Sequence, residues 1–363
     1  MKTTILLLVT ACVIAAELPV QIRARDPLVL YAGRWTDDEA PRARWSGASL
    51  RFRFNGQAAQ VLLDGDGDNR WQVSVDGVAT QVLTLSRGSG VYAVAEGLAM
   101  GRHEVELFKA TEGFTGATTC RGIRLPAGGS LVKAKPRVRS IEFIGDSITA
   151  GYGIESNDRN EHFSPATENA WYTGGAIAAR RLDADYYGVA WSGGRLSQGE
   201  GVQVPPLWSK TEPDGADWDF ARHQVDAVVV NLGTNDERFD KPWDGVKYRE
   251  ALRGFIAGIR ARYPKAHIFA TIGPMTLGPN ADIQHACNEI AAERRKAGDG
   301  KVHAIDLFLQ DESTGFAADW HPSRKGNERM ADMLVTAVSQ ALGWNAGPVG
   351  APAPVRPPVR SGR

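Results

Sequence analysis

The pattern of apolar and polar residues changes character near residue 139. Before that point, over residues 27–125, short stretches alternate apolar and polar positions and are separated by turn pairs such as Asn55-Gly56 and Asp76-Gly77. Alternation with period two predicts strands, and many short strands with regular turns predict an all-β jelly roll or sandwich. The expected strands include Ser49–Phe54, Ala59–Leu63, Trp71–Val75 and His103–Phe108.

From residue 139 to residue 345 the pattern alternates between short apolar runs and longer stretches with helical spacing. Several of the runs are almost continuously apolar, as expected for parallel strands that are covered on both faces. This region therefore predicts a doubly wound α/β domain with its site beyond the carboxyl ends of the strands. The expected strands are Ser140–Ile144, Tyr186–Ala190, Ala227–Leu232, His267–Ile272 and Val302–Leu307, and the expected helices are Ala170–Leu182, Lys247–Tyr263, Ala281–Lys296 and Arg324–Leu342.

The remaining segments are predicted to be a leader, a linker and a tail. Residues 1–16 combine Lys2 with a short apolar run and small residues at the end, which is typical of a secretory signal peptide. Lipoprotein anchoring at Cys12 is the alternative, and either interpretation predicts a secreted or periplasmic protein. Residues 126–138 predict a linker, and the Pro/Gly/Arg-rich residues 346–363 predict a disordered tail.

Composition narrows the classes of partner. The 42 basic and 42 acidic residues balance, which argues against nucleic acid, because that partner requires a concentrated basic surface. No later segment is apolar enough to predict an integral membrane span. Cys120 and Cys287 fall in different predicted domains, and no Cys/His spacing predicts zinc, so we expect neither a structural disulfide nor a metal or organic cofactor.

Four residues of types that can take part in catalysis each follow a predicted strand. Ser147 ends the run Ile141–Ser147, and Gly193, Asn235 and His321 come after later strands. Each of them alone fits an ordinary turn, but together they supply a nucleophile, a base and donors for an oxyanion. We therefore predict a serine hydrolase site. His162 competes with His321 for the role of base.

These residues sit in blocks that resemble a known superfamily. Gly145-Asp-Ser147, Gly193, Gly233-Thr-Asn-Asp236 and Asp319-Trp-His-Pro322 are similar to the ordered blocks of the SGNH (GDSL) hydrolases. The first half resembles the N-terminal jelly-roll domain of carbohydrate esterase family 2, in stretches that include Gly33-Arg34-Trp35, Arg44-Trp45-Ser46-Gly47 and Asn69-Arg70-Trp71. The likeness spans approximately residues 29–342.

The resemblance implies an esterase that removes O-acetyl groups from plant polysaccharides such as xylan or glucomannan. Ser147 would be the nucleophile and His321 the base, with an oxyanion hole formed by the Ser147 N–H, the Gly193 N–H and the Asn235 side chain. Many superfamily members orient the histidine with an aspartate three residues earlier, where this chain has Ala318. We expect Asp319 to take that role, and a backbone carbonyl is the alternative.

Aromatic residues near these blocks are candidate platforms for sugar rings, although core packing accounts for most of the ten tryptophans. Three other interpretations remain open. The chain could hydrolyse lipid, aryl or pectic acyl esters, it could be a carbohydrate-binding protein with a decayed esterase site, or its β domain could serve only as a packing partner. The candidate platforms are Trp320, Trp191, Tyr152, Trp208 and Trp243.

Overall fold

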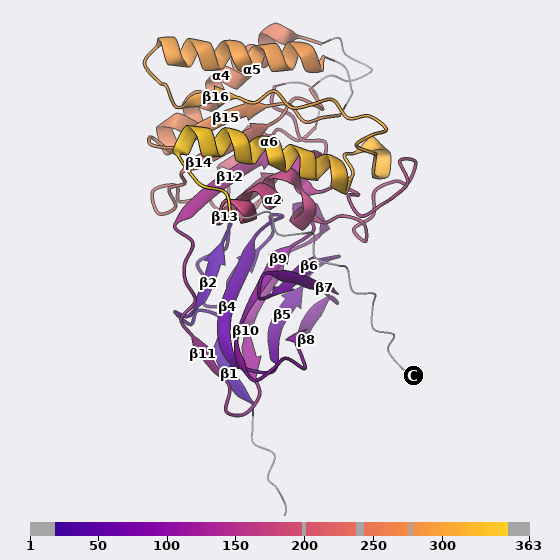
Figure 1. Ribbon diagram of the computed structural model, residues 1–363, viewed down its shortest axis with the longest axis vertical. Helices are drawn as coiled ribbons and strands as arrows, with labels where there is room; N and C mark the ends of the chain where they lie inside the picture. Colours follow the sequence, from indigo (N-terminus) through magenta and orange to yellow (C-terminus); the bar gives the residue numbers. More distant parts are fainter. Residues whose placement is uncertain (1–18, 198–200, 237–242, 276–278, 348–363) are drawn as a thin grey trace, which may run out of the picture.

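The computed structural model describes residues 19–197, 201–236, 243–275 and 279–347. The predicted leader (1–16) and the predicted tail beyond residue 347 lie outside the described residues. Figure 1 shows an all-β domain stacked end to end against an α/β domain. The fold class predicted from the sequence is therefore confirmed.

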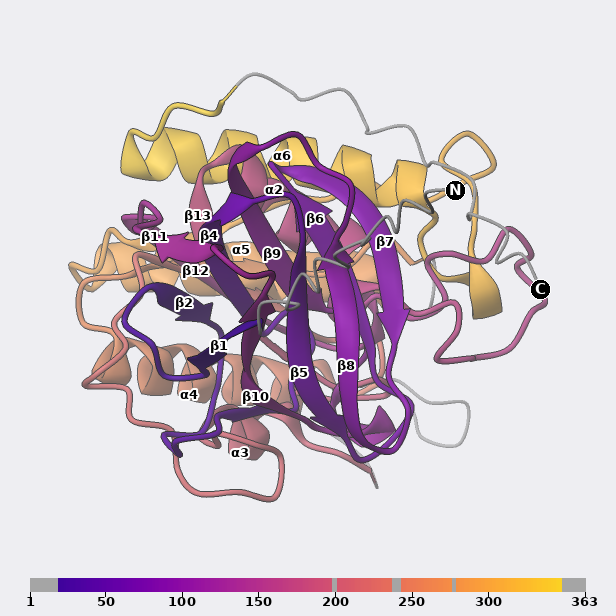
Figure 2. The same cartoon turned by 90° about the horizontal axis from the view of Figure 1, so that it is seen from below.

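The N-terminal domain consists of two antiparallel sheets (Figure 2). One has the order β1-β10-β5-β8, with β3 on β10, and the other has the order β11-β4-β9-β6-β7, with β2 on β4. The strands are β1 (Val20–Arg23), β2 (Val29–Ala32), β3 (Arg42–Ala43), β4 (Ser49–Gly56), β5 (Ala59–Gly65), β6 (Arg70–Val75), β7 (Val78–Thr84), β8 (Gly88–Ala95), β9 (Gly101–Lys109), β10 (Thr118–Leu125) and β11 (Ser130–Val132).

Alternation along the strands builds the core between these sheets. In β5, Ala59, Val61 and Leu63 are buried while the residues between them are half-buried. They pack in one apolar cluster with residues of the opposite sheet such as Leu50 and Leu107, which are paired across β4 and β9. Burial of one face of each sheet is what fixes the register of these strands.

Two predicted boundaries of this domain are wrong. Strand β1 precedes residue 27 and pairs with β10, and strand β11 lies inside the predicted linker and pairs with β4. Both strands are short, with four and three residues, and β1 is largely exposed, so each is too brief for its pattern to mark a strand in sequence. Their pairing depends on the edges of sheets that other segments form.

The C-terminal domain contains a parallel sheet with the order β13-β12-β14-β15-β16. Figure 1 shows α4 and α5 on one face of this sheet and α2 and α6 on the other. The elements are β12 (Arg139–Gly145), α1 (Ser147–Ala150), α2 (Gly174–Arg181), β13 (Ala184–Ala190), α3 (Val204–Trp208), β14 (Ala227–Asn231), α4 (Gly245–Arg262), β15 (His267–Thr271), α5 (Asn280–Lys296), β16 (Val302–Ala304) and α6 (Arg324–Leu342).

The strand order of this sheet reverses around β12, because the chain passes from β12 outward to β13 and then back to β14 on the other side. Loops that leave neighbouring parallel strands at such a point diverge and leave a crevice beyond their carboxyl ends. Ser147 begins α1 just beyond the end of β12, and the loops that follow β13 and β14 carry Gly193 and Asn235, respectively. The topology therefore gathers three of the predicted site residues at one edge.

Buried charges join the two domains. Arg34 of the N-terminal domain is fully buried, and its guanidinium lies 2.7 Å from the carboxylate of Glu142 on β12. The same guanidinium donates to the carbonyls of Trp208 and Lys210 at 2.6 and 2.5 Å. A buried charge that loses its partner costs several kcal/mol, so this contact holds the domains in one arrangement.

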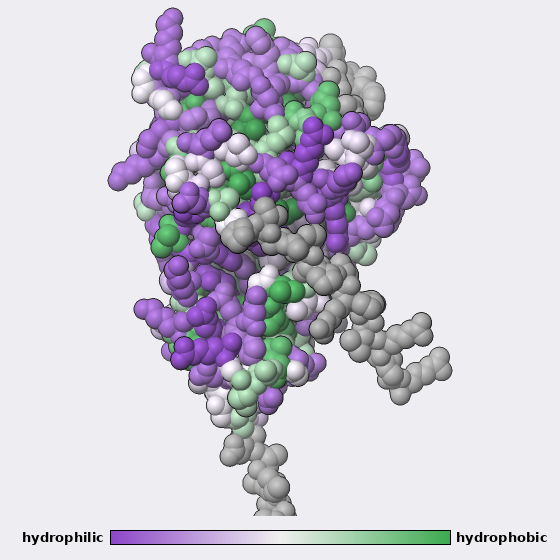
Figure 3. Space-filling model, in the orientation of Figure 1, coloured by the Kyte–Doolittle hydropathy of each residue, from purple (hydrophilic) through white to green (hydrophobic). Residues whose placement is uncertain are grey.

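The face of the molecule seen in Figure 3 is largely hydrophilic, with hydrophobic residues in scattered areas and in a strip along the N-terminal domain. Among the described residues, no helix is both long and apolar enough to cross a membrane. Cys120 and Cys287 are buried free thiols. They contribute to the apolar clusters of different domains.

Candidate active site

The serine lies at the first turn of a helix that starts directly after a buried strand. Gly145 ends β12, and a Cβ on this residue would lie 2.1 Å from the hydroxyl oxygen of Thr149, so only glycine fits. Asp146 caps α1 by accepting a hydrogen bond from the Ile148 N–H at 3.0 Å. Burial raises the pKa of Asp146 to about 7. The cap holds the strand-to-helix turn, and Ser147 follows it with 5% of its surface exposed.

The histidine reaches the serine from the other side of the site. Nε2 of His321 lies 2.8 Å from Oγ of Ser147, although 173 residues separate the two in sequence. Nδ1 of the same ring lies 3.0 Å from the carbonyl oxygen of Ala318. An imidazole with its Nδ1–H on a carbonyl presents a bare Nε2 to the serine hydroxyl, which is the tautomer that a general base requires.

A tight turn places the Ala318 carbonyl at the ring. Asp319 and Trp320 both have left-handed backbone conformations, with φ of 46° and 61°. This turn brings the backbone N–H of His321 to the same carbonyl, at 3.0 Å. Hydrogen bonds from the Asp319 N–H to the Glu161 carbonyl at 2.9 Å and from the Gln310 amide to the Trp320 carbonyl at 2.7 Å stabilise the uncommon conformation.

Burial sets the protonation state of the base. Only 8% of His321 is exposed, and desolvation lowers its pKa to about 4. Hydrogen bonding to the backbone and the charge of Asp319 raise the pKa, but by less. The imidazole is therefore neutral at neutral pH. A neutral imidazole within hydrogen-bond distance of a serine hydroxyl can accept its proton.

The prediction that Asp319 orients the ring of His321 directly is wrong. The Asp319 carboxylate accepts a hydrogen bond from the Tyr152 hydroxyl at 2.5 Å, and its other oxygen lies 2.8 Å from Nδ1 of His162. Burial raises the pKa of Asp319, but these two hydrogen bonds outweigh burial and hold the pKa below its ordinary value. The left-handed turn directs the carboxylate to these partners, which leaves Nδ1 of His321 to the Ala318 carbonyl, the alternative considered above.

The competing histidine is thereby placed as well. His162 has an exposed side chain and its Nδ1 contacts Asp319, whereas the Ser147 hydroxyl is contacted by His321. Sequence reasoning considered His162 only as a base and did not assign it to a network with Asp319 and Tyr152. A histidine and an aspartate 157 residues apart give no local signal of such pairing.

The two loops expected to supply oxyanion donors are tied together. Gly193 has φ of +75°, and the space where a Cβ would stand is open to at least 4 Å. The Asn235 amide donates to the Gly194 carbonyl at 3.0 Å. Asp236, the next residue, accepts from the backbone N–H groups of Leu196 and Ser197 at 2.9 and 2.6 Å. Asp236 therefore ties the loop after β14 to the loop after β13.

Of the three predicted sugar platforms Tyr152, Trp191 and Trp320, the first contacts the catalytic histidine directly. The ring of Tyr152 stacks on the His321 imidazole with centroids 4.1 Å apart, so this face of Tyr152 is occupied by the histidine rather than open to a sugar. Trp320 is 48% exposed next to His321 and packs edge-on against Phe316. Trp191 is half-buried, with its ring 6.5 Å from Trp45 of the N-terminal domain. Trp320 is the most exposed of these three side chains, and the Arg159 guanidinium lies over its ring, 4.7 Å from the ring centroid.

Two of the predicted platforms belong to the interior. Trp208 is 5% exposed, its indole N–H donates to Glu142 at 2.8 Å, and its ring packs against Phe255. Trp243 donates to Asp282 on α5 at 2.7 Å and packs on the apolar cluster between the sheet and α4. Both residues are therefore core or interhelix contacts, and neither supplies a ring face to the site.

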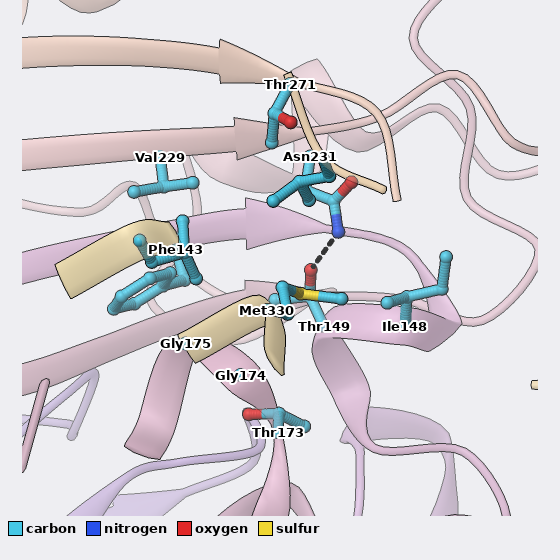
Figure 4. A pocket seen from close by; sticks show the side chains of 12 residues that line it. Phe143, Ile148, Thr149, Thr173, Gly174, Gly175, Val229, Asn231, Thr271 and Met330 are labelled. Atoms are coloured by element: carbon cyan, nitrogen blue, oxygen red, sulfur yellow. Dashed lines mark hydrogen bonds between the residues drawn. The ribbon is translucent and has the colours of Figure 1, made fainter. Parts of the chain in front are cut away.

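A small cavity is lined in part by the two residues that follow the serine in sequence (Figure 4). Its lining includes Ile148 and Thr149 of α1 together with Asn231, whose amide donates to the Thr149 hydroxyl at 3.4 Å. Ser147 and His321 do not line it. Within the described residues, no group of three His, Cys, Asp or Glu side chains is arranged to hold a metal ion.

Comparisons with known proteins place this arrangement in a family. Residues 31–134 match the model of the carbohydrate esterase 2 N-terminal domain, and residues 143–329 match that of the GDSL-like lipase/acylhydrolase family. The structure of a family two carbohydrate esterase from Clostridium thermocellum, in complex with cellohexaose, is 35% identical, with a TM-score of 0.83. This likeness covers 87% of the present chain and 100% of that one. The chain belongs to the family 2 carbohydrate esterases.

Other members of the family extend this relationship. Cellulase/esterase CelE of Acetivibrio thermocellus is 36% identical over 328 residues, which cover 88% of this chain and 40% of CelE. An acetylxylan esterase / glucomannan deacetylase of Cellvibrio japonicus is 25% identical over 339 residues, which cover 89% of this chain and 91% of that protein. Family membership makes the chain a carboxylic ester hydrolase by class, with the SGNH fold.

Proposed function

We propose that this carbohydrate esterase is a secreted serine esterase that removes O-acetyl groups from a plant cell-wall polysaccharide such as xylan or glucomannan. The observation that carries the proposal is the 2.8 Å contact between Ser147 Oγ and a neutral, buried His321. Family relatives named acetylxylan esterase / glucomannan deacetylase support the substrate class. The signal-like residues 1–16 support export.

Acylation begins when Ser147 Oγ attacks the acetyl carbonyl and His321 Nε2 takes the hydroxyl proton. The carbonyl π electrons move to oxygen, and the Ser147 N–H, the Gly193 N–H and the Asn235 amide stabilise the resulting oxyanion. Collapse of this intermediate breaks the bond to the sugar oxygen, which leaves with the proton from His321. The product is an acetyl-enzyme and a free sugar hydroxyl.

Deacylation repeats the sequence with water in place of the sugar. His321 takes a proton from water, hydroxide oxygen attacks the acetyl-enzyme, and collapse returns the proton to Ser147 Oγ as acetate leaves. The Ala318 carbonyl accepts from Nδ1–H throughout and stabilises the imidazolium that forms in each half. Its partial charge takes the place that a carboxylate has in a Ser-His-Asp triad.

Acetate release from acetylated xylan and glucomannan tests the proposal. Wild type should release acetate, and Ser147→Ala should lose the activity while keeping its fold and its binding of the polymer. Wild type that prefers long-chain aryl or lipid esters, or acetylated pectin, would instead support the other acyl-ester alternatives. Polymer binding without hydrolysis of 4-nitrophenyl acetate by wild type would support the decayed-site alternative.

Unacetylated β-glucan is a second candidate ligand. The C. thermocellum relative was solved with cellohexaose. Trp320 precedes His321 and is 48% exposed; the Arg159 guanidinium lies over one side of its ring, and the other side could stack on a pyranose. Cellohexaose should then inhibit 4-nitrophenyl acetate hydrolysis competitively. Absence of inhibition at millimolar cellohexaose would remove this candidate.

A further inference from the structure

A cluster of buried charged side chains lies where the N-terminal domain meets the turn after β13. Lys109, Glu112 and Glu168 are each fully buried. One carboxylate oxygen of Glu112 accepts from the backbone N–H of Ser192 at 2.7 Å, and the other accepts from the Ser192 hydroxyl. A carboxylate of one domain therefore holds both donors of a single residue in the other.

Ser192 directly precedes Gly193, whose N–H is expected to face the oxyanion. Gly193 itself has little to hold it, since it has no side chain and open space on its Cβ side. The neighbours on either side are fixed instead: Ser192 by Glu112, and Gly194 by its N–H to the Trp191 carbonyl at 2.8 Å and by the Asn235 amide. The two hydrogen bonds from Ser192 to the Glu112 carboxylate form a clamp. The orientation of the peptide between Ser192 and Gly193 thus depends on this clamp.

We propose that Glu112 of the N-terminal domain is a positioning residue that aims the Gly193 N–H at the developing oxyanion. This inference rests on the oxyanion hole of the proposed function. It gives the N-terminal domain a part in ester hydrolysis that is separate from packing and from sugar binding.

The surroundings keep Glu112 in place. Its own backbone N–H donates to Glu168 at 3.2 Å, and the ammonium of Lys109 donates to the Thr111 carbonyl at 2.7 Å and to the Glu112 carbonyl at 3.4 Å. Burial raises the pKa of Glu112 to about 7, against the hydrogen bonds from Ser192 and the charge of Lys109. The two Ser192 donors favour the carboxylate, which accepts with both oxygens, while burial also lowers the pKa of Lys109 to about 7.

Glu112→Ala removes the clamp. Amide hydrogen-exchange rates then measure how firmly the turn is held, independently of activity. In the full chain, amides of the 191–194 turn should exchange at least tenfold faster than in wild type, while amides of α4 keep their rates. Turnover of 4-nitrophenyl acetate should fall about 10- to 100-fold with KM changed less than about threefold, because misplacing a group that acts only in the transition state lowers kcat.

Three further variants complete the experiment. Glu112→Gln keeps the shape and one acceptor for the Ser192 N–H, so it should restore most of the lost turnover. Ser192→Ala removes only the hydroxyl contact and should cost about two- to fivefold in kcat; it replaces Glu112→Ala if that variant does not fold. Glu212→Ala is the matched control, since it breaks another interdomain ion pair, 3.3 Å from Arg42, and should leave both readouts unchanged.

Unchanged exchange in the turn together with unchanged kcat in Glu112→Ala would overturn the inference. Equal losses in Glu112→Ala and Glu212→Ala would also overturn it, because they would reflect general loosening of the domain interface. If wild type hydrolyses 4-nitrophenyl acetate but no acetylated polysaccharide, the substrate in the proposed function fails while the positioning role is still decided by these variants. If wild type hydrolyses neither, faster hydrogen exchange of the 191–194 turn in Glu112→Ala would support the clamp, and unchanged exchange would overturn it.

Discussion

Replacing Asp319 with asparagine separates two ways of holding the imidazole of His321. In a Ser-His-Asp triad the corresponding change lowers kcat by about 10⁴, because the histidine takes the wrong tautomer. Here Nδ1 of His321 is bonded to the Ala318 carbonyl at 3.0 Å, and the Asp319 carboxylate is bonded to Tyr152 and His162. Asp319→Asn leaves the carbonyl and hence the tautomer intact, so the loss should be far smaller.

The expected loss in kcat follows from two effects that Asp319 has on His321 without contacting its Nδ1. Its charge favours the imidazolium through space, and a charge in a solvent-accessible position contributes about 1 kcal/mol or less, which is about fivefold in rate. Its bond to Tyr152 also steadies the ring stacked on His321. We expect kcat to fall by no more than about tenfold. Asparagine is chosen over alanine because residue 319 has φ of 46°, a conformation that asparagine tolerates.

The assay is steady-state hydrolysis of 4-nitrophenyl acetate, with acetate release from acetylated xylan as a second substrate. Tyr152→Phe is the matched variant, since it removes the hydroxyl that Asp319 accepts from and keeps the ring against His321. It should give a smaller loss than Asp319→Asn, because the charge of Asp319 stays in place. A fall of 10³ or more in a folded Asp319→Asn variant would refute the reasoning and return Asp319 to direct contact with the ring.

Three further outcomes are expected. Asn235→Ala should lower kcat about 10²–10³-fold with little change in KM, measured on 4-nitrophenyl acetate, since it removes one oxyanion donor; a loss below threefold would exclude that role. The pKa of His321 is lowered to about 4, and the neutral form is the base, so kcat/KM should be lost as pH falls through about 4 and stay level across pH 6–7. A midpoint near 6.5 in that profile would contradict the buried, neutral base. Trp320→Ala should raise KM for acetylated polysaccharide about 3- to 10-fold through lost stacking and spare 4-nitrophenyl acetate; equal effects on both substrates would argue against a sugar platform.

Much of the fold could be predicted from patterns among neighbouring residues. The helix over residues 324–342 was expected at the bounds where α6 is found, because apolar spacing along a helix and a capping serine at Ser323 are properties of neighbouring residues. The strands β4, β5, β6 and β9 were predicted correctly because the alternation of apolar and polar residues is also a property of neighbouring residues. Strand β11 was missed because its pairing with β4 depends on an edge formed 75 residues earlier.

The sequence by itself determined the order of the elements and the residue types at the ends of the parallel strands, since periodicity and turn chemistry act between neighbours in the chain. Only the tertiary structure decided which partner each of these side chains meets. Asp319 turned away from His321 because a left-handed turn gave the ring nitrogen to the Ala318 carbonyl. Trp208 turned inward to Glu142, and Glu112 reached the turn before Gly193 from another domain. Hydrogen-bond partners are set by atoms that folding brings within about 3 Å, and distance along the chain carries no record of them.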